Sequence, residues 1–262
     1  MNRVEIYWVV GESTDCGKTT ISCGLIRYLN SIGKSALGFK PFAGARILQG
    51  LDRFKEDLSR HEIVGNDGVR LCAASGLLDS SMYDVANPHF LFFRNNILEP
   101  VLSRTGSKCL KNSFYSKLEF FDVCMKNNKI KDALSNFPQL SEASYFHGSV
   151  DFEQQAEAAY RLLLERRPHS LVIEGAGPFL PFWRKKSRQQ VDHVLVILRG
   201  RAFFFENVNM NVVNDGSGLS GIQDLLRSSK IVFQKARSLP VQMVAPSQID
   251  SATDVLVSRL LN

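Results

Sequence analysis

The chain has 262 residues, of which 44% are hydrophobic and 22% are charged, with a formal net charge of +6. This composition is ordinary for a globular protein, and no apolar run approaches the ~20 residues that a membrane-spanning helix needs. The N-terminus shows no secretory signal and the five cysteines form no C-x-x-C pair, so we expect a cytoplasmic protein with reduced thiols and no zinc site. The basic residues fall in short clusters without a recognition signature, so we expect neither nucleic acid nor a membrane as a partner.

The organising stretch is residues 11–19, GESTDCGKT, which fits the phosphate-loop pattern G-x-x-x-x-G-K-[ST]. An apolar run at 4–10 precedes it, and residues 19–29 carry apolar side chains at helical spacing, which predicts a strand, a loop and a helix. Small residues at Gly11 and Gly17 allow backbone N–H groups to turn toward phosphate oxygens. In this motif Lys18 would reach the β- and γ-phosphates, and the Thr19 hydroxyl would ligate Mg2+.

A second strand is predicted at residues 35–40, after a helix that Gly33 closes. A strand, helix and strand within this length predict a right-handed parallel crossover. Lys40 then lies at the C-terminal end of its strand, beside the phosphate loop, where parallel sheets bind ligands. The alternative interpretation of Lys40 is a solvated lysine at a strand end.

The middle of the chain carries weaker signals. We predict a loop and a polar helix over 43–62, a helix from 66 to 74, an apolar loop over 87–100, and helices with a basic face over 105–135. Asp67 would be either the N-cap of its helix or a carboxylate near the metal, and the sequence favours the cap. A metal role for His147, in a predicted loop, has no support from the pattern.

Residues 151–166 predict an amphipathic helix that Asp151 caps, and residues 170–174 predict a buried parallel strand. That strand ends in Glu174, at the same edge of the sheet as the phosphate loop. A carboxylate there can hold Mg2+ directly or through water, and we favour this role over a surface acid that caps the loop.

The C-terminal third predicts strands at 191–199, 210–214 and 241–244, and helices at 219–229 and up to residue 261. The aromatic run at 203–205 is typical of a core or of a subunit contact. Together the elements predict an α/β fold: a mostly parallel sheet with helices on both faces, a three-layer α/β/α arrangement of the P-loop NTPase type. We expect one domain over residues 1–262.

Three stretches, taken together and in this order, resemble the dethiobiotin synthetase family. The family's phosphate loop, Gly-Thr-Asp-Thr-x-Val-Gly-Lys-Thr, corresponds to residues 11–19. Its Tyr-Lys-Pro corresponds to residues 39–41, FKP, and its Val-Glu-Gly-Ala-Gly to residues 173–177, IEGAG. Weaker matches are the ND pair at 66–67 and the EP pair at 99–100. The resemblance covers most of residues 1–180.

The resemblance implies an ATP- and Mg2+-dependent carboxylating cyclo-ligase of biotin biosynthesis, a homodimer in most members of the family. Diaminopelargonic acid takes up CO2 as a carbamate, MgATP phosphorylates the carbamate, and the second amine closes a cyclic urea. The implied catalytic residues are Thr14, Lys18 and Lys40, and the implied metal ligands are Thr19, Asp67 and Glu174. The implied ATP-binding residues are Gly11, Ser13, Thr14, Asp15, Cys16, Gly17, Lys18, Thr19 and Thr20, with Asn214 as the candidate for recognition of the base.

The chain departs from the family on the substrate side. Residues 12–13 replace the family's Thr-Asp pair, residues 43–44 stand where the family has a serine, and the bulky run PFLPFW occupies 178–183. These departures leave open a substrate other than the diamine. Two further interpretations stay open: a related P-loop amidoligase, for whose usual glutaminase domain the chain has no room, and a regulatory nucleotide-binding protein.

Overall fold

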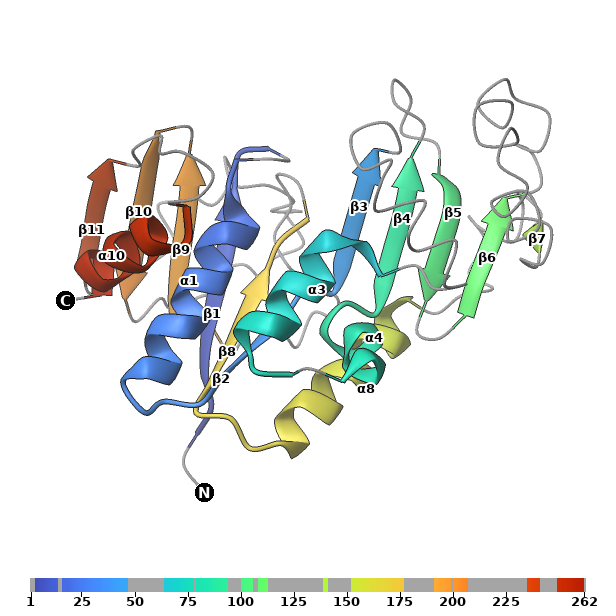
Figure 1. Cartoon of the computed structure of the whole chain (residues 1–262), viewed down its shortest axis with the longest axis horizontal. Helices are drawn as coiled ribbons and strands as arrows, with labels where there is room; N and C mark the ends of the chain where they lie inside the picture. Colours follow the sequence, from blue (N-terminus) through green and yellow to red (C-terminus); the bar gives the residue numbers. More distant parts are fainter. Residues whose placement is uncertain are drawn as a thin grey trace, which may run out of the picture.

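The computed structural model describes residues 3–13, 16–46, 64–77, 79–93, 100–105, 108–112, 139–140, 152–176, 191–198, 200–206, 235–240 and 249–261. Its main sheet has six strands in the order β11-β10-β9-β1-β8-β2 (Figure 1). The parallel part consists of β1 (Glu5–Gly11), β2 (Ala36–Phe39), β8 (Ser170–Glu174) and β9 (His193–Leu198). Two antiparallel strands, β10 (Arg201–Glu206) and β11 (Lys235–Pro240), extend it beyond β9.

Helices cover both faces of this sheet. On one face lie α1 (Lys18–Ser31) and α10 (Ile249–Leu261), and on the other lie the short α4 (Tyr83–Ala86), which follows a 3-10 turn at Ser80–Met82, and α8 (Phe152–Glu165). A further helix, α3 (Gly65–Ala74), contributes buried side chains to both cores. The predicted three-layer α/β fold is therefore confirmed.

The central strand shows why its sequence is continuously apolar. Ile6, Trp8 and Val10 belong to the core on the α8 side, whereas Tyr7 and Val9 belong to the core on the α1 side. Because successive side chains of a strand point to opposite faces, a strand covered by helices on both sides needs apolar residues at every position. The predicted parallel crossover from β1 through α1 to β2 is also present, with β8 inserted between the two strands.

A second sheet corrects the prediction for the middle of the chain. It contains β3 (Phe42–Arg46), β4 (His89–Phe93), β5 (Pro100–Thr105), β6 (Lys108–Asn112) and β7 (Gln139–Leu140), in that order. The predicted loop at 87–100 is therefore wrong over β4, and the predicted helices over 105–135 are wrong over β6. The loop and helix predicted at 43–62 are wrong at their start. Two of the pairings, β3 with β4 and β6 with β7, join distant segments, which local proline signals do not reveal.

Outside the second sheet the predicted boundaries are close. The aromatic run at 203–205 lies in β10, which pairs with β9, and the buried Phe204 makes it a core element. The strands β10 and β11 were not predicted. The predictions for residues 47–62, 113–135, 210–214, 219–229 and 241–244, and for His147, lie outside the described residues.

None of the helices within the described ranges combines the length and the apolar character that crossing a membrane requires.

Candidate active site

The phosphate loop joins the end of β1 to the start of α1, and glycine is required at both of its ends. At Gly17 the backbone has a φ of 94°, in the left-handed region that disfavours side chains. At Gly11 a Cβ atom would lie 2.3 Å from the Sγ of Cys16 and 3.1 Å from the carbonyl oxygen of Ile197. The loop therefore folds back tightly over the end of the strand.

The start of α1 has the character of an anion site. Its N-cap is Gly17, which offers no side-chain hydrogen bond to the first turn, and the first helical bond runs from the N–H of Ile21 to the carbonyl of Gly17. The earlier N–H groups of an uncapped helix have no acceptor within the helix and carry the positive end of its dipole. A phosphate group is the type of ligand that such an end attracts.

Lys18 adds a buried positive charge to this loop. The residue is 5% exposed, and its ammonium donates to the carbonyl oxygen of Ser13 at 2.5 Å and contacts the Sγ of Cys16 at 3.6 Å. Within the described part of the chain no carboxylate pairs with Lys18. A buried ammonium that has only neutral partners favours an anionic ligand beside it, since burial of an unpaired charge is costly.

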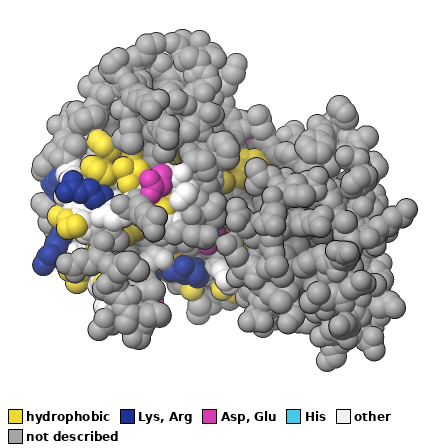
Figure 2. All heavy atoms as spheres, turned by 90° about the horizontal axis from the view of Figure 1, so that it is seen from above, with side chains coloured by type: hydrophobic (Ala, Val, Ile, Leu, Met, Phe, Trp, Pro, Cys, Tyr) yellow, Lys and Arg dark blue, Asp and Glu magenta, His cyan; other side chains and the backbone are white. Residues whose placement is uncertain are grey.

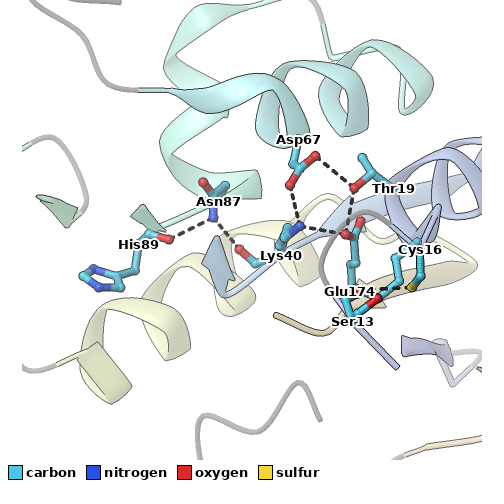
Figure 3. A network of polar contacts seen from close by, with 9 residues as sticks. Ser13, Cys16, Thr19, Lys40, Asp67, Asn87, His89 and Glu174 are labelled. Carbon is cyan, nitrogen blue, oxygen red and sulfur yellow. Dashed lines mark hydrogen bonds and ion pairs between the residues drawn. The ribbon is translucent and has the colours of Figure 1, made fainter. Parts of the chain in front are cut away.

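Four side chains from separate segments of the chain meet beside this loop (Figure 3). The ammonium of Lys40 lies 2.7 Å from Oε1 of Glu174 and 2.5 Å from Oδ2 of Asp67. The hydroxyl of Thr19 lies 2.8 Å from Oε1 of Glu174 and 2.9 Å from Oδ1 of Asp67. The two carboxylates thus hold the lysine and the threonine between them.

The sheet topology explains this meeting. Lys40 follows the last residue of β2, Glu174 is the last residue of β8, and Thr19 is the second residue of α1, which follows β1. Because β1, β8 and β2 are parallel neighbours, their C-terminal ends lie at one edge. Asp67 comes from the first turn of α3. Its predicted N-cap role is wrong: the N-cap is Val64, without a side-chain bond, and the Asp67 carboxylate is turned toward Lys40 and Thr19.

The carboxylates keep the lysine charged in a buried place. Burial alone would lower the pKa of Lys40, but the charges of Glu174 and Asp67 and their hydrogen bonds outweigh burial and raise that pKa above its ordinary value. Burial likewise favours the neutral form of Asp67, yet Lys40, followed by Thr19 and Arg70, holds the pKa of Asp67 below its ordinary value. Both groups are therefore charged near neutral pH.

The donor set suits a hard divalent cation. Thr19, Asp67 and Glu174 present a hydroxyl and two carboxylates, the oxygen ligands that Mg2+ prefers. The second oxygen of Glu174, Oε2, is buried and has no hydrogen-bond partner among the described residues, so it is available for a ligand. No group of three or more His, Cys, Asp or Glu side chains with metal-binding geometry occurs in the described ranges.

The structure brings together four of the residues singled out from the sequence: Thr19, Lys40, Asp67 and Glu174. Lys18 precedes Thr19 in α1, and its ammonium contacts Ser13 and Cys16 of the loop. Thr14, Asp15 and Asn214, and the bulky run at 178–183, lie outside the described residues.

The structure also shows the contacts of Thr20, which was predicted to bind ATP, and of two residues near the site that were not predicted. The hydroxyl of Thr20 accepts a hydrogen bond from Arg70 at 3.1 Å. Sequence reasoning gave no role to Arg70 or to Asn87, whose side-chain amide contacts the backbone of Lys40. The i, i+3 spacing of Asp67 and Arg70 on one helix was the available signal for Arg70.

The face above the strand ends carries no continuous patch of one charge among its described residues. In Figure 2 the Lys and Arg side chains form separate groups, interspersed with hydrophobic and acidic ones.

Comparisons with known proteins give one short similarity. No family model matches the chain. The ATP-dependent dethiobiotin synthetase BioD of Phenylobacterium zucineum (strain HLK1) is 43% identical over 53 residues, which are 20% of this chain and 20% of that protein. The chain therefore matches about a fifth of the length of this curated relative, and the similarity relates only a part of it to that synthetase.

Proposed function

We propose that this protein is an ATP- and Mg2+-dependent ligase of the dethiobiotin synthetase type, which forms a cyclic urea from a diamine and CO2. The observation that carries the proposal is the joint contact of Lys40 and Thr19 with Asp67 and Glu174, beside a phosphate loop. The short similarity to a dethiobiotin synthetase supports the same class of reaction.

In the proposed reaction the carbamate and the phosphates carry negative charge, and the ammonium groups of Lys18 and Lys40 would lie beside them. One amine of the substrate takes up CO2 as a carbamate, and a carbamate oxygen attacks the γ-phosphorus of ATP while ADP leaves. The second amine then attacks the carbamate carbon, phosphate leaves, and a cyclic urea remains. Such phosphoryl transfer depends mainly on positioning and on charge stabilisation.

The residues divide this work between them. Lys18 and the N–H groups at the start of α1 would bind the triphosphate, and Lys40 would balance the charge of the carbamate and of the transferred group. Thr19, Asp67 and Glu174 would hold Mg2+, which when bound neutralises charge on the phosphates.

The decisive experiment measures ADP release with MgATP, bicarbonate and diaminopelargonic acid. We expect the diamine to stimulate release and to be converted to a cyclic urea detectable by mass spectrometry. If the diamine has no effect while another amine or carboxylate stimulates release, the ligase class stands and the biotin assignment falls.

The role of Lys40 is tested in the same assay. Lys40→Ala should lower kcat by about 100-fold or more, as loss of one charge-stabilising group does, with little change in ATP affinity. Lys34→Ala is the matched control, because Lys34 is an exposed lysine paired with Glu5 at the other end of the strands. An equal fall in ATP affinity for Lys40→Ala would contradict the proposed role on the substrate side.

A further inference from the structure

Asn87 is a polar side chain with no exposed surface, located between α4 and β4. Its amide nitrogen donates one hydrogen bond to the carbonyl oxygen of Lys40 at 2.7 Å and another to the carbonyl oxygen of His89 at 3.1 Å (Figure 3). The two N–H groups of an amide are thereby both used. Without them each of these two carbonyl groups would lose one donor.

The backbone of Lys40 depends on this segment because the sheet no longer holds it. The pairing of β2 with β8 ends at Phe39, one residue earlier. The N–H of Lys40 donates to the carbonyl oxygen of Ala86 at 2.7 Å, while its carbonyl accepts from Asn87. Both backbone polar groups of Lys40 are therefore bound by two successive residues, Ala86 and Asn87.

The same side chain also supports the helix that carries Asp67. A Cβ atom added to Gly68 would lie 3.3 Å from the Cβ of Asn87, so the first turn of α3 packs directly on Asn87. Gly68 follows Asp67 in the chain. Asn87 thus contacts the backbone on both sides of the ion pair between Lys40 and Asp67.

We infer that Asn87 is a positioning residue for Lys40: its amide fixes the turn from which the Lys40 ammonium reaches Asp67 and Glu174. The inference rests on the proposed function for the role of Lys40 in turnover, whereas the placement of the ammonium is independent of it. An asparagine suits this place because it offers two donors in the plane of one amide, directed at two carbonyl groups.

The first experiment observes the ammonium group itself. In 15N-labelled protein, the NMR signal of the Lys40 side-chain ammonium is assigned by its absence from the spectrum of Lys40→Met. Asn87→Asp, which keeps the shape but removes both donors, should shift or broaden that signal, and Asn87→Ser, which keeps one shorter donor, should do so to a smaller extent. Val257→Ala is the control, because it removes buried atoms on α10, which packs on α1, and Val257 belongs to the core on the opposite face of the sheet from Ala86, the neighbour of Asn87.

The outcomes separate positioning from general destabilisation. An unchanged Lys40 signal in both Asn87 variants, or an equal shift in Val257→Ala, would overturn the inference. If Asn87→Asp does not fold, Asn87→Ser alone decides between these results.

The second experiment connects positioning with turnover. In the folded Asn87 variants kcat should fall, on the order of 100-fold, while the KM for ATP stays within about twofold, since a misplaced catalytic group lowers rate without removing the phosphate loop. A rise in the KM for ATP with unchanged kcat would contradict the inference. If the wild-type protein shows no ATP turnover with any substrate, the proposed function fails, and the ammonium signal still decides on Asn87.

Discussion

At the scale of single residues, the site is a buried ion pair whose parts depend on one another. The side chains of Lys40 and Glu174 are 7% and 0% exposed, and Asp67 supplies a second carboxylate. Removal of one partner leaves a buried charge without compensation, which costs about 3–5 kcal/mol. Lys40→Met should therefore lower the free energy of unfolding in urea by about this amount.

A matched substitution at the surface sets the scale for that measurement. Lys34 pairs with Glu5 at 3.3 Å, but both side chains are at least 40% exposed, and such pairs contribute less than about 1 kcal/mol. Lys34→Met should accordingly have little effect. Equal losses in the two variants would mean that Lys40 is not the buried counter-charge of Asp67 and Glu174.

The sequence predicted these residues unequally. The positions of Lys40 and Glu174 are predictable because Lys40 follows a short apolar strand, Glu174 ends another, and parallel strands end at one edge. For Asp67 the local pattern favours a helix cap, since a helix start and an acidic residue usually mean capping, and only the family resemblance implies a metal ligand. The contact with Lys40 depends on the packing of α3 beside α1 and β2, which no local pattern reveals. Asn87 gave no signal, because a buried amide that binds a distant backbone has no pattern in the neighbouring sequence.

At the scale of elements, the start of α1 depends on the left-handed conformation of Gly17. A Cβ there would meet no atom within 4 Å, so Gly17→Ala adds backbone strain without a clash. The strain costs about 1–2 kcal/mol, and relief of it would turn the N–H groups of the loop away from a phosphate. We expect weaker ATP binding by at least tenfold, measured by calorimetry.

Gly33 provides the control on the same helix. It lies just past the C-terminus of α1 with a φ of 80°, as predicted for the residue that closes the helix, and it also has open space around it. Gly33→Ala should cost similar stability without an effect on ATP affinity. If both variants bind ATP as the wild type does, the loop at Gly17 is not the nucleotide site.

The two sheets differ in how far they can be predicted from the sequence. The strands of the parallel sheet were predicted because each is a continuous apolar run between helices, a local property of the sequence. The second sheet differs from the prediction because β3 pairs with β4, and β6 with β7, across long stretches of chain. In addition, Pro100, at the first position of β5, resembles a loop signal. Proline is tolerated at the first residue of a strand, so a proline at this position does not by itself indicate a loop.

At the scale of the whole molecule, His193 couples stability to pH at the end of the sheet remote from the site. Its ring stacks between Tyr7 and Phe204, at centroid distances of 4.5 and 5.5 Å. Burial lowers the pKa of His193, against the opposing charges of Glu5, Asp192 and Glu206. The Nδ1 atom is buried and has no partner in the described part of the chain.

The sign of the pH effect follows from this direction. Below the unfolded pKa of about 6.5, the unfolded chain takes up a proton that folded His193 resists, so stability falls with falling pH. The loss continues down to the folded pKa, at about 1.4 kcal/mol per unit of difference. Urea unfolding between pH 7.5 and 5 should show this slope, and His193→Phe should reduce it. An equal slope in the variant would assign the effect to other groups.

Ligand binding should stabilise the whole fold, because the site is built from β1, β2, β8, α1 and α3 together. A ligand that binds only the folded chain adds about 2.7 kcal/mol to the free energy of unfolding at a concentration of 100 times its Kd. MgATP should therefore raise the urea midpoint of the wild type, and EDTA should reduce the gain if the cation site of Thr19, Asp67 and Glu174 contributes. Lys18→Ala should lose most of the gain, since its ammonium is the buried cation of the loop without a carboxylate partner in the described residues. Stabilisation of this variant equal to that of the wild type would place the nucleotide elsewhere.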